Sequence, residues 1–422
     1  MFFVRLFGWD NRRYLMVSDL GDLKDMLFRL NLEMAIPGEV RHSLAEILPL
    51  LKKERLMDLA YFYSVSGRSR MNKPELVDCL LERMQEFGQF VMIAVMLRDV
   101  EKDFLQSLIA KNTRGRKPKE KPEPRTGVII KDNYAPPLAT GFLMDIGLVF
   151  SFIKDGQISF ICTDEVLEAY PVLFSPTSEG MRIKYQYVHS YLVAMTNLYG
   201  VFPVQHFCDI FLSQNPGFGT TESDLLTVVY VLCKREQEYE TDGSQIVNTI
   251  YNSELADPNG LGNLQRQVQG KPFYVPAKDE LFKYEDDLYY PPTDELDALQ
   301  SFLLQEICPD KMAAEELADE IKLLCMSEAS SNEIMKELER HNLVFKSEQQ
   351  VKNLALLIVD VSNTSRMVSN RGFTPLELRR QRETYQPQTS AKASHPKTSH
   401  PETLRSKSSR AKITMLFPPA GL

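Results

Sequence analysis

The sequence predicts an α+β protein that is predominantly helical. Apolar residues recur at spacings of three and four through most of the 422 residues, which is the period of amphipathic helices. Asp155-Gly156 and Asp242-Gly243 each lie between short apolar runs, a setting that indicates a β-hairpin. Apolar residues make up 43% of the chain and charged residues 25%, so cores can form, and the length favours two or three domains.

Residues 1–110 are predicted to be an N-terminal helical region. Residues 1–18 alternate weakly, and they form either a strand or a segment that packs on the following helix. Asp19 begins that helix, which has leucines on one face. A break follows at Ile36-Pro37-Gly38-Glu39, and the next helical segment is interrupted at Pro49.

Residues 50–86 predict a short helix, a tight basic loop and a second helix. The first helix carries the one-face spacing i, i+3, i+4, i+7 at Leu56, Leu59, Ala60 and Tyr63. Asn72 is placed to cap the second helix, Pro74 lies in its first turn, and Glu75 completes a capping-box spacing. Residues 89–111 are predicted to continue as one further helix.

The rest of the chain divides by composition. A segment rich in Pro, Lys and Arg at 111–126 is the first expected domain boundary. We expect an α+β domain at 127–253, an extended connection at 254–293 and a helical C-terminal domain at 294–382. Residues 383–422 form a basic tail that we expect to be disordered, because it has too little apolar surface to order itself.

The charge of the chain is unevenly distributed. The net charge is −8, yet residues 111–125 hold seven Lys/Arg and two Glu, and residues 384–422 hold six Lys/Arg and one Glu. The remainder is therefore strongly acidic. Basic segments joined to acidic bodies favour a polyanionic partner. The alternative is that these segments only keep the chain solvated.

The helix–loop–helix pattern LKKERLMDLAYFYSVSGRSRMNKPELVDCL resembles the N-terminal helical module of the transcription terminator Rho, a module related to SAP domains. The resemblance covers residues 50–86 of the chain. It implies nucleic-acid binding, because that module accompanies nucleic-acid binding and its SAP relatives contact DNA. The cations available for phosphate contact are Lys52, Lys53, Arg68, Arg70 and Lys73. The alternative is a scaffold for protein contact.

The chain departs from Rho itself. Rho is an ATPase that needs a Walker A loop, G-x-x-x-x-G-K-[ST], and here Gly270-Lys271 is followed by Pro272. The order of a Rho-like module, an α+β middle and a helical C-terminal part resembles uncharacterised bacterial multidomain proteins. So does the NRGFTPLEL element at 370–378. Several of those relatives continue into a cysteine-rich zinc motif, but this chain has no cysteine after Cys325.

Residues 113–119 (TRGRKPK) resemble an AT-hook, which lays an Arg-Gly-Arg-Pro backbone in the minor groove. Lys117 separates the second arginine from the proline, and this shifts the residue that sets the backbone trajectory. A solvated linker is the preferred interpretation, with non-specific attraction to phosphate in either case. The candidate contact residues are Arg114, Arg116, Lys117 and Lys119.

Residues 185–247 have the order of a winged helix: three helices and then a hairpin at Asp242-Gly243. The third predicted helix begins apolar, and acidic residues follow it at Glu236, Glu238 and Glu240. A helix that reads bases presents Arg, Lys, Asn or Gln outward. A structural or protein-contact role is therefore preferred for this region.

No catalytic signature is present, so we expect a protein that is not an enzyme and that needs no cofactor and no metal. The six cysteines lack metal-ligand spacing and indicate buried thiols in a reducing compartment. No apolar run approaches the length of a membrane span, and charges interrupt the N-terminal segment, so we expect a cytoplasmic bacterial protein. The sequence favours binding of RNA or DNA, with a link to transcription termination or its regulation. The alternative is a protein–protein adaptor.

Overall fold

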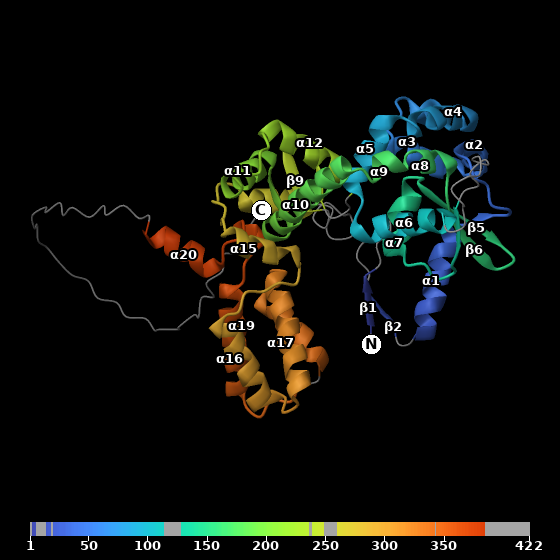
Figure 1. Ribbon diagram of the computed structural model, residues 1–422. Coiled ribbons are helices and arrows are strands. Elements are labelled where there is room, and N and C mark those ends of the chain that lie inside the picture. The colour runs from blue at the N-terminus through green and yellow to red at the C-terminus, as the bar shows by residue number, and fades with distance from the viewer. Residues whose placement is uncertain are drawn as a thin grey trace, which may run out of the picture. The chain divides into compact units, whose positions relative to one another are not determined.

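A computed structural model describes residues 2–5, 14–17, 20–113, 128–235, 239–248, 260–341 and 343–384 (Figure 1). The candidate residues Arg114, Arg116, Lys117 and Lys119 lie outside the described residues, as does almost all of the basic tail. Residues 1–378 form one compact unit, and residues 379–422 form a second. The described part is mainly helical with small sheets, which confirms the predicted fold class.

The first core combines N-terminal helices with a four-stranded sheet. Its helical elements are α1 (Leu20–Met34), α2 (Leu44–Ile47), η1 (Leu48–Leu50), α3 (Lys53–Phe62), η2 (Arg68–Arg70), α4 (Lys73–Met84), α5 (Phe87–Met96), α6 (Asp99–Thr113), α7 (Pro137–Asp145), α8 (Asp164–Glu168) and α9 (Tyr170–Leu173). The strand order is β3 (Ile36–Pro37), β5 (Val149–Lys154), β6 (Gln157–Cys162) and β4 (Val128–Lys131), and only the β3–β5 pair is parallel. A separate antiparallel pair is formed by β1 (Phe2–Arg5) and β2 (Tyr14–Val17).

The predicted hairpin between β5 and β6 is confirmed. Its two loop residues, Asp155 and Gly156, have φ angles of 51° and 74°. Positive φ at both positions is the geometry of the two-residue turn whose twist matches that of the flanking strands.

Two expectations for this region are corrected. Residues 89–111 form two helices, because Leu97 adopts an extended conformation between α5 and α6. Leu97 is itself buried, so the apolar spacing continues across the break and hides it. The basic segment at 111–126 does not separate two cores, since Phe104 of α6 packs edge-on against Phe160 of β6 at 5.8 Å.

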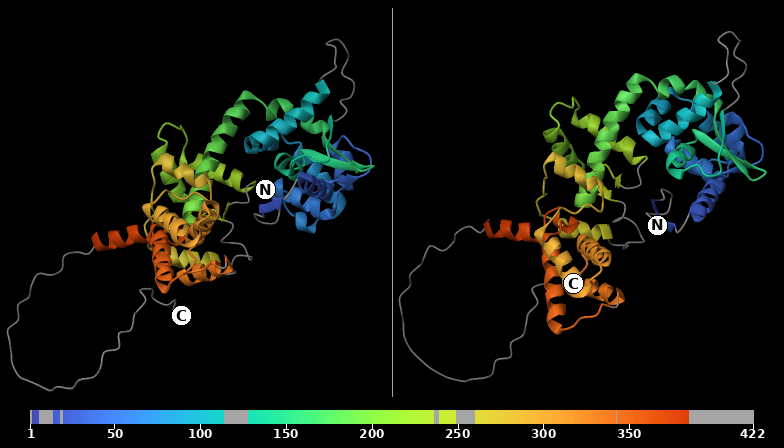
Figure 2. Two further views of the ribbon diagram at one scale, coloured as in Figure 1. Left: turned by 90° about the horizontal axis from the view of Figure 1, so that it is seen from below. Right: turned by 60° about the horizontal axis from the view of Figure 1, so that its bottom comes forward.

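The second core has the winged-helix order that the sequence predicted. The elements are α10 (Pro176–Tyr199), β7 (Val201–Pro203), α11 (Val204–Gln214), α12 (Glu222–Cys233), β8 (Tyr239–Thr241) and β9 (Gln245–Asn248). The three strands form an antiparallel sheet in the order β7-β9-β8. The long helix α10, green in Figure 2, also packs against α5 of the first core.

The predicted extended connection at 254–293 contains helices. These are α14 (Gly260–Val268), α15 (Lys278–Leu281) and the 3₁₀ turn η3 (Phe282–Glu285). Leu264 and Val268 of α14 bury against Val201 and Val247 of the small sheet, and this burial stabilises a helix whose glycines disfavour it locally.

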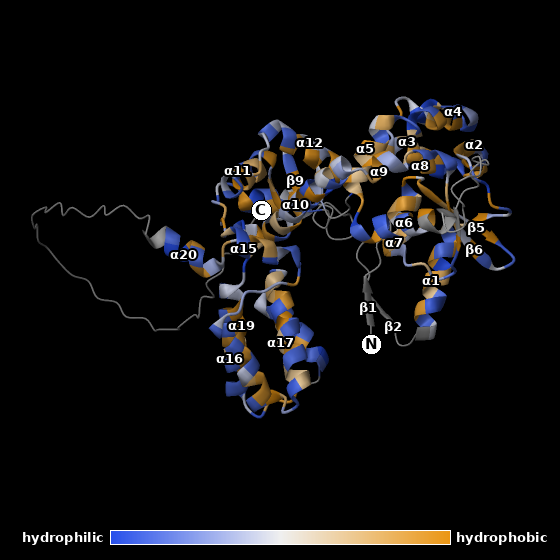
Figure 3. Cartoon of the chain, in the orientation of Figure 1, coloured by the Kyte–Doolittle hydropathy of each residue, from blue (hydrophilic) through white to orange (hydrophobic). Residues whose placement is uncertain are grey.

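The third core is helical, as expected for 294–382. It contains α16 (Asp294–Phe302), the π-helical turn η4 (Leu303–Ile307), α17 (Lys311–Met326), α18 (Ser331–Leu338), η5 (Glu339–His341) and α19 (Glu348–Thr364). The chain ends its described part with η6 (Val368–Asn370) and α20 (Pro375–Thr384). Apolar and polar residues alternate along α16, α17 and α19 in Figure 3, as amphipathic helices require. Among the described residues, no helix is both long enough and apolar enough to cross a membrane.

Candidate nucleic-acid interface

Residues 50–86 fold as the predicted helix–loop–helix. Asn72 Oδ1 accepts a hydrogen bond from the Glu75 amide at 3.0 Å, and Glu75 Oε2 accepts from the Asn72 amide at 2.8 Å. This capping box satisfies two amides at the start of α4. The Tyr63 hydroxyl, at the end of α3, donates to the Ile146 carbonyl at 2.7 Å and so ties the segment to the chain that leads into β5.

Three of the five candidate cations lie together in the loop. Gly67 turns the chain with a φ of 72°, and η2 then carries Arg68 and Arg70 toward Lys73 at the start of α4. The Arg68 guanidinium lies 4.9 Å from the ring centroid of Tyr61, which is 69% exposed. Arg70 is exposed, and no acidic residue occurs between Ser64 and Lys73. The loop therefore presents positive charge beside an exposed aromatic ring.

The other two candidate cations lie elsewhere. Lys52 caps the start of α3 and Lys53 is its first residue, whereas Tyr61 lies in the last turn. Eight residues of helix separate Lys53 from Tyr61 by about 12 Å. The five cations therefore form two groups instead of one cluster.

A second cation–aromatic pair comes from the winged-helix region. Lys234, directly after α12, donates to Ser64 Oγ at 2.9 Å, and its ammonium lies 5.1 Å from the ring centroid of Tyr230. Tyr230 is 59% exposed on α12. Ser64 follows α3, and its amide donates to the Tyr61 carbonyl at 3.0 Å. We call the set Tyr61, Arg68, Arg70, Lys73, Tyr230 and Lys234 the loop-end site.

Sequence reasoning missed Tyr61, Tyr230 and Lys234. The available signal was an aromatic residue outside the buried stripe of each of two amphipathic helices. Such a position faces away from the core, so its exposure was predictable. That Tyr230 and Lys234 lie next to residues of the helix–loop–helix at 50–86 depends on contacts between distant segments.

Arg235 fixes the chain next to Lys234. Arg235 is only 5% exposed on its side chain, and its guanidinium makes two hydrogen bonds of 2.8 Å to the carboxylate of Glu101 in α6. It also donates to the Met96 carbonyl at 2.8 Å and stacks over the Phe142 ring at 4.1 Å. A buried bidentate pair of this kind fixes position, so Lys234 is presented from a rigid support.

Acidic residues limit the basic surface to the loop. Asp78 and Glu82 are exposed on α4, and Glu54 is exposed at the start of α3. The outward face of α12 presents Leu226 and Tyr230, with Glu222 and Asp224 in its first turn. That face lacks the arginine, lysine and amide donors that read base edges.

Metal-ligand geometry and the environment of His206 complete the description of the candidate chemistry. No group of three or more His, Cys, Asp or Glu side chains there is arranged to hold a metal ion. His206 stacks on Phe273 with ring centroids 3.7 Å apart, and burial lowers the pKa of its imidazole to about 4. His206 is therefore neutral at pH 7 and acts as a packing group.

Comparisons with known proteins add no assignment to this geometry. No protein-family model, no curated protein and no solved structure matches the chain.

Proposed function

We propose that the chain is a non-enzymatic protein that binds single strands of RNA or DNA through the loop-end site. The observation that carries this proposal is the Tyr61–Arg68 stack, with an exposed ring held beside cations. Bases of single strands stack on aromatic rings and on guanidinium planes, and each stacked base contributes about 1–3 kcal/mol. Arg70, Lys73 and Lys234 supply positive charge for the phosphates that flank such a base.

The likeness of residues 50–86 to the Rho module supports a role in transcription termination or its regulation in a bacterial cytoplasm. The proposed activity is binding alone, so it differs from the activity of Rho, which is an ATPase. Base stacking tolerates any sequence, so we expect weak sequence preference and strong dependence on salt.

A protein–protein adaptor is the second candidate. The outward face of α12 favours it, because Leu226 and Tyr230 are exposed there without the donors that nucleic-acid readout needs. In that case the loop cations contact an acidic protein partner instead of phosphates.

Fluorescence anisotropy of labelled single-stranded RNA, single-stranded DNA and duplex DNA at several salt concentrations tests the proposal. The full chain is compared with Arg68→Ala/Arg70→Ala/Lys73→Ala and with Tyr61→Ala. The matched control, Lys311→Ala/Lys336→Ala/Lys352→Ala, removes the same charge from exposed positions of the third core.

We expect the loop variant to lose affinity and to reduce the slope of log K against log salt by about 1.4, since it removes the phosphate contacts of Arg70 and Lys73 and each contact contributes about 0.7 on single strands. Tyr61→Ala weakens binding without changing this slope, and the control variant binds like the unmodified chain. Equal losses of affinity in the loop and control variants contradict the assignment of binding to the loop-end site. The absence of binding at micromolar protein and low salt contradicts the function and favours the adaptor.

A further inference from the structure

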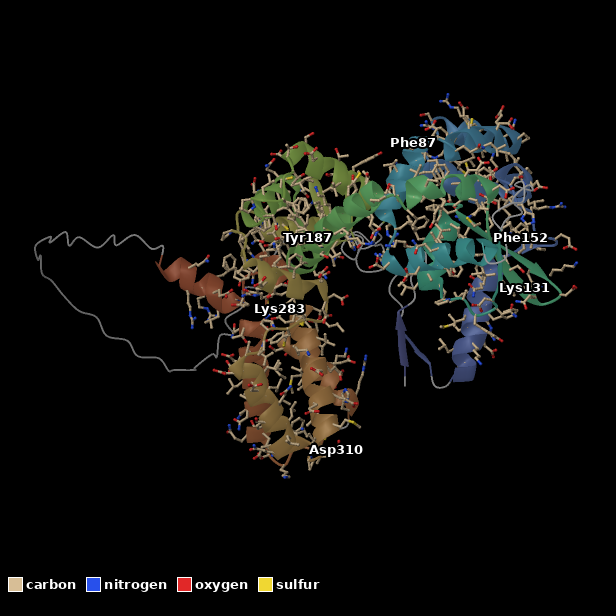
Figure 4. The ribbon with its side chains drawn as sticks, in the orientation of Figure 1. Phe87, Lys131, Phe152, Tyr187, Lys283 and Asp310 are labelled. Atoms are coloured by element: carbon tan, nitrogen blue, oxygen red, sulfur yellow. The ribbon has the colours of Figure 1, made fainter. Side chains whose placement is uncertain are left out.

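A second candidate site lies in the second core and shares no residue with the loop-end site. It is an open pocket of about 540 Å³, bounded by α10, by the loop after α11 and by the start of α15. A pocket of this volume is large enough for a small molecule. Its wall contains Tyr187 of α10, which Figure 4 labels, and Phe218 of the loop. Both rings pack against the second core, so the pocket is fixed within one folded body.

Two lysines line this pocket, and neither forms an ion pair with a carboxylate of the described residues. Lys278 Nζ donates to Asn215 Oδ1 at 2.8 Å, and the ammonium of the exposed Lys184 lies 5.8 Å from the ring centroid of Phe218. The described wall of the pocket contains no acidic residue, and the exposed Asp279, which follows Lys278, lies outside it. The pocket is therefore positive although the net charge of the chain is −8, and it favours an anion.

Asn215 holds Lys278 in place. Its Oδ1 also accepts from the Tyr187 hydroxyl at 2.7 Å, and its Nδ2 donates to the Tyr191 hydroxyl at 2.9 Å and to the Phe211 carbonyl at 2.8 Å. An ammonium group has three donors, and Asn215 takes one of those of Lys278, so two are left for a ligand. Lysine binds phosphate as a point charge, and two lysines together suit a phosphate group.

Aromatic and aliphatic side chains form the apolar part of the wall. The rings of Tyr187 and Phe218 are stacked at an interplanar angle of 22°, with centroids 5.5 Å apart. Ile183, next to Lys184 in α10, is 56% exposed and also lines the pocket. A planar ring can pack on this surface while a charged substituent of the ring reaches the lysines.

The side-chain amides of the pocket are already used by the fold. Gln214 Nε2 donates to the Pro276 carbonyl at 3.0 Å, and Gln214 Oε1 accepts from the Tyr191 hydroxyl at 3.2 Å. Asn215 is bonded at both its oxygen and its nitrogen, as described above. Neither amide is placed to read the edge of a base, so we expect the pocket to accept both large and small rings.

We propose that this pocket binds an aromatic phosphate monoester, the chemical class that includes the nucleoside monophosphates. The phosphate contacts Lys184 and Lys278, and the ring packs on Ile183 and Phe218. This site is independent of the loop-end site and adds a small-molecule ligand to the protein.

Isothermal titration calorimetry of the full chain with four probes tests the proposal. AMP has the ring and the phosphate, UMP has a smaller ring, adenosine lacks the phosphate, and inorganic phosphate lacks the ring. We expect saturable binding of AMP, binding of UMP within about fivefold of AMP, and binding of adenosine and of inorganic phosphate at least tenfold weaker. The proposal is overturned if AMP shows no saturable binding up to about 10 mM, if UMP does not bind, or if adenosine or inorganic phosphate binds as tightly as AMP.

Substitutions assign the contacts. Lys184→Gln/Lys278→Gln should weaken AMP binding at least tenfold at low salt, and glutamine keeps a donor for Asn215. Phe218→Leu should weaken it about fivefold by removing the ring but keeping apolar volume. The matched control, Lys336→Gln/Lys352→Gln, removes the same charge from exposed positions of the third core and should bind AMP like the unmodified chain. Equal losses of AMP affinity in the two lysine variants overturn the proposal.

The loop-end site must be separated from this pocket in the same experiment. Arg68→Ala/Arg70→Ala/Lys73→Ala should bind AMP like the unmodified chain, and Lys184→Gln/Lys278→Gln should bind single-stranded RNA without a terminal phosphate like the unmodified chain. If the first variant loses AMP affinity, AMP binds at the loop-end site and the proposal is overturned. If the second variant loses affinity for RNA as strongly as for AMP, the lysines belong to strand binding, and the small-molecule assignment is overturned.

Discussion

Arginines in two regions of this chain carry the same charge in opposite surroundings. In the buried joint formed by Glu101, Phe142 and Arg235, the guanidinium is bound on both sides of its fork and stacked on a ring. In the loop-end site, Arg70 is exposed, and the neighbouring Arg68 contacts a ring at 4.9 Å and a backbone carbonyl at 3.4 Å, with no carboxylate partner among the described residues.

This difference separates charges that hold the fold from charges that are available to a partner. Removing a charge from water is costly, so a buried arginine must be matched within the protein, and breaking the match leaves the other charge uncompensated. An exposed cation gains little from the fold, because water already solvates it. The loop-end cations can therefore be changed with little loss of stability, and their effect should appear in binding.

The largest expected loss of stability comes from a substitution in the buried joint. Arg235→Ala leaves Glu101 buried and unpaired, and it should lower the free energy of unfolding by about 3–5 kcal/mol. Urea unfolding followed by circular dichroism measures this loss. Lys234→Ala, at the adjacent half-buried position, is the control and should cost less than about 1 kcal/mol. A loss below about 1 kcal/mol for Arg235→Ala contradicts the structural role of the joint.

Two glycines with the same backbone angle give the next comparison. Gly147 and Gly67 both have a φ of 72°, but a Cβ on Gly147 would come within 2.8 Å of Met84 and 3.3 Å of Leu59, whereas Gly67 has open space. Gly147→Ala should cost about 2–3 kcal/mol and Gly67→Ala about 1 kcal/mol, because only the first adds crowding to backbone strain. Equal losses of stability in urea unfolding would show that the helix–loop–helix at 50–86 packs loosely on its neighbours.

Removal of a partly exposed ion pair should cause a smaller loss of stability, and this loss should depend on pH. Glu179 is held by Arg182 at 2.6 Å and by Lys102 at 2.9 Å, and hydrogen bonds from these cations lower its pKa from 4.5 to about 2. A lowered carboxyl pKa stabilises the folded state above pH 4.5, and this stabilisation is lost as the pH falls toward 2.

We therefore expect the unmodified chain to exceed Glu179→Gln in stability by about 1 kcal/mol or less above pH 4.5, since Glu179 is partly solvated. Urea unfolding of both chains between pH 6 and pH 2.5 should show this difference shrinking as the pH falls. A difference that is constant across this range contradicts the pairing.

Per substitution, the smallest effect on stability belongs to the loop-end site. The Arg68→Ala/Arg70→Ala/Lys73→Ala chain should unfold within about 0.5 kcal/mol per substitution of the unmodified chain, although its affinity for single strands falls. Urea unfolding and fluorescence anisotropy on the same preparation measure stability and affinity separately. A large loss of stability would mean that the loop cations belong to the fold, as Arg235 does.

Local features of this protein were predictable because their causes lie within a few residues. The Asn72–Glu75 capping box, the Asp155-Gly156 turn and the helices of the third core depend on short-range hydrogen bonds and on one-face apolar spacing. The sequence determined these elements and the predominantly helical fold class by itself.

Tertiary structure decided what lies beside what. Leu97 interrupts a continuous apolar pattern, and Lys234 reaches Ser64 across 170 residues of chain. Such contacts depend on how the buried faces pack. They also depend on which polar groups become buried and then need hydrogen-bond partners. Spacing along one segment carries no information about either, so the loop-end site emerged only in the folded chain.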